Sequence, residues 1–91
     1  MAGSRLVKNP AVVSTQLEDG GVLLDLETTA YFSLNRTAFT IWNLMDDAPA
    51  VDQIATRMTA EFEIDYDHAL ASAQRVVDTL ERERLIRLES A

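Results

Sequence analysis

The sequence predicts an α+β fold of the winged helix-turn-helix type, in which a three-stranded antiparallel meander is followed by three helices. Residues 11–34 are rich in β-branched side chains and contain short turns, which is typical of strands. From residue 35 onward the apolar residues recur at helical spacing. A chain of 91 residues is the size of one small domain. We expect residues 1–10 to form a flexible N-terminal arm and residues 11–88 to form the domain.

The three predicted strands cover residues 11–17, 22–26 and 30–34. Asp19-Gly20 lies between the first two, and Asp-Gly is a strong hairpin signal because glycine tolerates the positive φ of tight turns. The second turn, at Glu27-Thr28-Thr29, has no glycine.

Side-chain alternation divides the second and third strands into two faces. We expect one face to lie on the core and the other to point outward, although the outward face is not purely polar. The predicted buried set is Val22, Leu24, Leu26, Ala30, Phe32 and Leu34, and the predicted outward set is Leu23, Asp25, Tyr31 and Ser33.

Asn35 is the predicted N-cap of the first helix, since its side-chain oxygen can accept a free amide of the first turn. This helix is expected to end near Asp46-Asp47, before the break at Ala48-Pro49. Trp42 lies on its apolar stripe and is assigned to the core.

The second helix is predicted from about residue 51 to residue 64, and the third from Tyr66 to Glu83. The run Leu85–Leu88 is either a last helical turn or a small strand. The core line of the third helix is predicted to be Leu70, Ala73, Val77 and Leu80.

Composition excludes several classes of function. There is no cysteine and only one histidine, so thiolate and histidine metal clusters are excluded. With 8 basic and 15 acidic residues the net charge is −7, which argues against nucleic acid as a partner. No apolar run is long enough to span a membrane, and residues 1–8 lack the apolar core of a signal peptide, so we expect a cytoplasmic protein.

No catalytic constellation is present. His68 follows Asp67 near the start of the third helix, but no nucleophile motif accompanies it, so we interpret it as a solvated residue. The sequence therefore predicts a protein without catalytic residues, metal or cofactor.

The third strand is a predicted open edge of the sheet. Natural proteins usually protect such edges with charge or proline, and residues 30–34 contain neither. The third helix carries Val76 beside its core line, with Arg75 and Arg82 near that flank. A groove between strand and helix would accept a peptide as an added strand.

Several stretches resemble the PqqD-like family. They are Asp19–Leu26, Tyr31–Ala38 with its Leu-Asn-x-Thr-Ala pattern, Ile41-Trp42 and Val51–Ala55, followed by a long helix that closes on Leu85-Ile86. Members of this family recognise ribosomally made peptides that are later modified, and the Asp19–Leu26 opening looks closest to the standalone lasso-peptide type. The resemblance covers about residues 11–88.

The resemblance implies a binding protein, in which the leader segment of a precursor peptide adds to the third strand and packs against the third helix. It also implies delivery of the precursor to a separate leader peptidase, transglutaminase-like in lasso systems, or to another modifying enzyme. The peptide-binding residues it implies are Tyr31, Phe32, Ser33, Leu34, Ser72, Arg75, Val76, Thr79 and Glu83.

Three positions depart from the family pattern. Arg36 replaces a frequent proline, Ala50 replaces a capping threonine or serine, and Arg84 replaces a glycine before the final apolar pair. The missing cap at Ala50 is expected to cost about 1 kcal/mol.

Two alternatives remain open. One is a DNA-binding winged-helix regulator, although residues 65–84 carry at least as many acidic as basic residues. The other is a small dimerisation module that pairs through its sheet edge.

Overall fold

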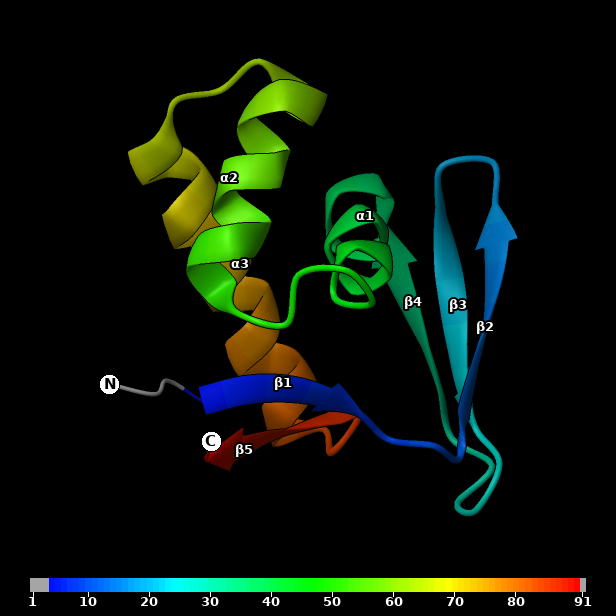
Figure 1. The fold of residues 1–91 in the computed structure, drawn as a ribbon. Helices are drawn as coiled ribbons and strands as arrows, with labels where there is room; N and C mark the ends of the chain where they lie inside the picture. Colours follow the sequence, from blue (N-terminus) through cyan, green and yellow to red (C-terminus); the bar gives the residue numbers. More distant parts are fainter. Residues whose placement is uncertain (1–3, 91) are drawn as a thin grey trace.

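The computed structural model describes residues 4–90 and confirms the α+β fold (Figure 1). A three-stranded antiparallel sheet of order β2-β3-β4 precedes three helices, and a separate two-stranded sheet pairs β1 with β5. The elements are β1 (Ser4–Lys8), β2 (Val12–Leu17), β3 (Gly20–Asp25), β4 (Tyr31–Asn35), α1 (Arg36–Leu44), α2 (Val51–Phe62), α3 (Tyr66–Arg82) and β5 (Ile86–Ser90).

The N-terminal segment differs from the flexible arm expected for residues 1–10. Residues 4–8 form β1, which pairs antiparallel with β5 so that Leu6 lies opposite Leu88. The Leu6 side chain is buried in the core, and this burial fixes the segment to the domain. The expectation for residues 1–3 lies outside the described residues.

The predicted faces of β3 are reversed. Leu23 is fully buried, whereas Leu26 is 58% exposed. Leu23 pairs with Phe32 and Gly21 pairs with Leu34, so all four residues share the inner face of the sheet. The prediction was right for the β4 residues Phe32 and Leu34, which pack against the core. It was wrong for Ala30, which is exposed, and for Asp25, which is buried rather than outward.

The Phe39 ring of α1 explains why a glycine, Gly21, occupies the inner face of β3. A Cβ at this position would lie 2.3 Å from the Phe39 ring, so only a bare backbone lets α1 pack this closely on β3. The contact places the aromatic ring of α1 directly on the sheet.

Helix α1 begins as predicted. The Asn35 side chain accepts a hydrogen bond from the Ala38 amide at 2.8 Å. The last helical residue is Leu44, slightly earlier than expected. Trp42 is in the core as predicted, and Lys8 Nζ lies 4.3 Å from the centroid of its ring.

The ends of α2 and α3 show the effects of two departures from the family pattern. Ala50 precedes α2 without a side-chain cap. Arg84, just after α3, adopts a left-handed conformation with φ 62°, which favours glycine. The turn is nevertheless closed, because Leu85 N–H donates to the Leu80 carbonyl at 2.9 Å.

Candidate functional site

Strand β4 is an open edge of the three-stranded sheet. Within residues 4–90, β3 is the strand that pairs with it, and no other backbone hydrogen bond reaches Tyr31–Asn35 from its far side. Figure 1 shows β4 as the strand of this sheet that lies nearest the helices. The margin is therefore free and faces the helical half of the molecule.

The register defines which backbone groups are free. Asp25 N–H donates to the Ala30 carbonyl, so these two residues form a hydrogen-bonded pair. Because hydrogen-bonded and non-hydrogen-bonded pairs alternate along an antiparallel ladder, Phe32 and Leu34 direct their amide and carbonyl groups toward β3. Tyr31 and Ser33 direct theirs toward the open side, at the spacing that an added strand requires.

A groove of about 280 Å³ lies beside this edge. It is apolar at its base, and its wall is formed by one flank of α3. Its lining residues are Leu34, Ala38, Arg75, Val76, Thr79 and Leu80. The structure thus brings together four of the residues predicted for the site, contributed by β4 and α3.

Two lining residues, Ala38 and Leu80, were not among the predicted site residues. Ala38 ends the Leu-Asn-x-Thr-Ala pattern and lies four residues after Leu34, so the pattern itself carried the signal. Leu80 was assigned to the core line of α3, and its exposed edge, 1% of its surface, still reaches the base of the groove.

The polar part of the groove is organised around Arg75. Its guanidinium donates to the Ser72 hydroxyl at 3.5 Å, and Ser72 itself is 7% exposed. The Thr79 hydroxyl donates to the Arg75 backbone carbonyl at 3.1 Å, and this bond keeps the Thr79 side chain close to the helix. Arg75 is exposed and makes no ion pair within the described residues, so its charge is free for an acidic group.

The other predicted site residues lie around the groove rather than in it. Tyr31 is 71% exposed and faces the outer side of the sheet, where it lines a hollow with Val13, Thr15, Val22 and Leu24. Ser33 is exposed on the same outer side, and Phe32 is half-buried on the inner face. Glu83 is exposed and follows the last turn of α3.

His68 occupies an ordinary structural position. Its backbone amide donates to the Asp65 carboxylate at 2.8 Å, which is the N-cap bond of α3. Within residues 4–90, no group of three or more histidine and carboxylate side chains is placed to hold a metal ion. No helix in that same range has the length and apolar character needed to cross a membrane.

Known proteins show two kinds of similarity to this chain. Residues 20–86 match the family model described as coenzyme PQQ synthesis protein D (PqqD). No curated protein matches the chain.

Two solved structures share the fold. One is TbiB1 in complex with the TbiA(β) leader peptide, with 27% identity and a TM-score of 0.79 over 89% of this chain and 94% of that one. The other is a lasso peptide synthetase B1 complexed with the leader peptide, with 25% identity and a TM-score of 0.79 over 91% of this chain and 98% of that one.

Proposed function

This chain belongs to the PqqD family, and from that premise we propose that it binds the leader segment of a ribosomally synthesised precursor peptide. We assign the mature peptide made from this precursor to the lasso class, because the two similar solved structures are complexes with a leader peptide and one of them is a lasso peptide synthetase B1. The role is recognition rather than catalysis.

The leader adds as a fourth strand to the free edge of β4. The observation that carries this proposal is the combination of an unpaired edge with an adjoining groove. Backbone pairing with Tyr31 and Ser33 supplies affinity that does not depend on sequence, while side chains that alternate into the groove supply selectivity.

The groove favours particular side chains in the leader. Leu34 and Val76 are half-buried and offer apolar surface to a branched or aromatic residue. Arg75 lies at the same wall and suits an acidic residue of the peptide. We propose Tyr31, Phe32, Ser33, Leu34, Ser72, Arg75, Val76, Thr79 and Glu83 as the contact region, with Ala38 and Leu80 at its base.

The bound precursor is delivered to a separate enzyme. We propose a transglutaminase-like leader peptidase as that partner, or another modifying enzyme encoded nearby. Its cleavage of the precursor is expected to be faster when this chain is present than when it is absent, because binding raises the local concentration of the substrate.

Fluorescence anisotropy with a labelled leader peptide tests the proposal. A leader encoded beside this chain is expected to bind with a micromolar or lower Kd, about −8 kcal/mol or better. A scrambled peptide of the same composition is the matched control. Equal affinity for both peptides, or binding of neither, contradicts the proposal.

A further inference from the structure

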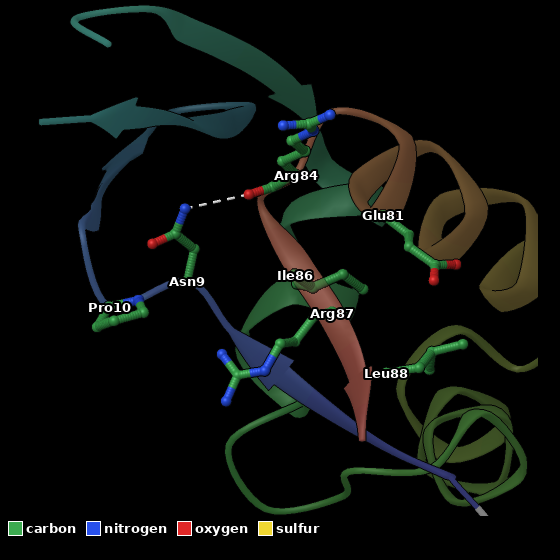
Figure 2. Close-up of a pocket in the computed structure, with 7 residues that line it drawn as sticks. All are labelled: Asn9, Pro10, Glu81, Arg84, Ile86, Arg87 and Leu88. Atoms are coloured by element: carbon green, nitrogen blue, oxygen red, sulfur yellow. Dashed lines mark hydrogen bonds between the residues drawn. The ribbon is translucent and has the colours of Figure 1, made fainter. Parts of the chain in front are cut away.

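Another open strand edge lies on β5, in the two-stranded sheet rather than in the sheet that contains β4. Figure 1 shows β5 along one margin of the molecule, with β1 beside it. In the two-stranded sheet β5 has β1 as its neighbour, and within residues 4–90 no other backbone group pairs with Ile86–Ser90. A hollow of about 490 Å³ runs along this strand, with Arg87 and Leu88 in its lining (Figure 2).

The register shows which groups this edge presents. Leu6 N–H donates to the Pro49 carbonyl at 2.7 Å, so the Leu6 amide points away from β5. Leu88 lies directly opposite Leu6. In an antiparallel ladder, the two residues of a pair either both direct their amide and carbonyl groups toward each other or both direct them away from the partner strand. The amide and carbonyl of Leu88 therefore face the open side.

The side chains of β5 are arranged symmetrically about Leu88. Arg87 and Glu89 flank it and share one face of the strand, where they form an ion pair at 2.6 Å. Leu88 is on the other face and is 44% exposed, next to the buried Ile86. If two such strands pair antiparallel with Leu88 opposite Leu88, residue 87 of one copy lies opposite residue 89 of the other.

We propose that two copies of this chain associate through their β5 strands, about a two-fold axis that passes beside Leu88. The central pair exchanges two backbone hydrogen bonds, and the two leucine side chains cover each other. On the other face, Arg87 of each copy lies opposite Glu89 of the second copy. The product is a continuous four-stranded sheet of order β1-β5-β5-β1.

This pairing uses no residue of the β4 edge or of the groove lining, because β4 belongs to the other sheet and the groove is lined by β4, α1 and α3. The dimer therefore presents two peptide sites on one particle. The contact area of two short strands is small, so we expect a weak and concentration-dependent dimer.

Sedimentation equilibrium over a concentration series tests the proposal with a charge exchange. Arg87→Glu makes both flanking residues acidic, and Glu89→Arg makes both basic. Each variant alone is expected to associate less than the parent chain, because like charges lie opposite each other. An equimolar mixture of the two is expected to form a heterodimer with a roughly tenfold higher association constant than either variant alone.

The double variant Arg87→Glu/Glu89→Arg is the matched control. It restores opposite charges across the axis, so it is expected to dimerise like the parent chain. Leu88→Pro removes the central donor while leaving the bonds to β1, and it is expected to remain monomeric with its fold intact by circular dichroism.

Any of three results would overturn the proposal. The first is a parent chain that remains a monomer at the highest concentration reached, and the second is a mixture that associates no better than the single variants. The third is a dimer that Leu88→Pro does not weaken. The last result would assign association to another surface. None of these results bears on leader binding, which anisotropy measures separately at low protein concentration.

Discussion

Replacing Val76 by aspartate tests the groove most sharply. Val76 is half-buried in the wall formed by α3, and a bound peptide would bury it further. The loss of apolar contact is expected to cost about 1 kcal/mol, roughly half the value for fully burying such a side chain. Covering an unpaired carboxylate adds about 1–3 kcal/mol.

Arg75 lies in the same groove and can pair with the new carboxylate. At such an exposed site this pairing offsets at most about 1 kcal/mol of the cost. The net expectation is a weakening of about 2 kcal/mol, which is roughly a thirtyfold rise in the Kd for the leader. The assay is anisotropy with the labelled leader, with thermal unfolding measured in parallel.

Ala71→Asp provides the matched control. Ala71 is exposed on the same helix and does not line the groove, so the variant has the same net charge without the local effect. An unchanged Kd for Val76→Asp, or an equal loss for Ala71→Asp, refutes the placement of the peptide in this groove.

Three further predictions follow from the backbone geometry. Ser33→Pro removes an amide on the open side of β4 but breaks no bond to β3. The affinity for the leader is therefore expected to fall at least tenfold, with little change in Tm. Unchanged affinity would argue against strand addition. Gly21→Ala forces a Cβ against the Phe39 ring and is expected to lower the free energy of unfolding by about 1–3 kcal/mol in urea titrations, and Phe39→Leu in the same chain should recover part of it. Arg84→Gly relieves the left-handed φ and is expected to raise the free energy of unfolding by up to about 1 kcal/mol; a decrease would mean that the Arg84 side chain itself stabilises the turn.

Local signals in the sequence were enough to predict the elements that frame the groove. The hairpin signal at Asp19-Gly20 and the Asn35 cap each act through a few neighbouring atoms. The cap forms as predicted, and the hairpin forms one residue earlier than predicted, with Glu18 and Asp19 in the turn and Gly20 paired with Leu17 as the first residue of β3. The strand alternation of β4 was also sufficient, because Phe32 and Leu34 contrast with the polar Ser33 between them.

The faces of β3 could not be predicted in this way. Val22, Leu23 and Leu24 are all apolar, so alternation alone does not say which of them is inside. The decisive feature is the fit of the Phe39 ring on Gly21, a contact between two elements.

The pairing of β1 with β5 was missed for a similar reason. Its partners lie at opposite ends of the chain, and nothing in residues 4–8 alone indicates that they meet Ile86–Ser90. Pairing over such a sequence separation depends on the helices that bring the two ends together.

Amide hydrogen exchange, measured by NMR with and without the leader peptide, tests strand addition most directly. We expect the amides of Tyr31 and Ser33 to exchange readily in the free chain and to become strongly protected when the leader is bound. The amides of Phe32 and Leu34 are expected to be protected already in the free chain, because they bond to β3. If the leader binds and the amides of Tyr31 and Ser33 still exchange at their free rate, the peptide does not pair with β4.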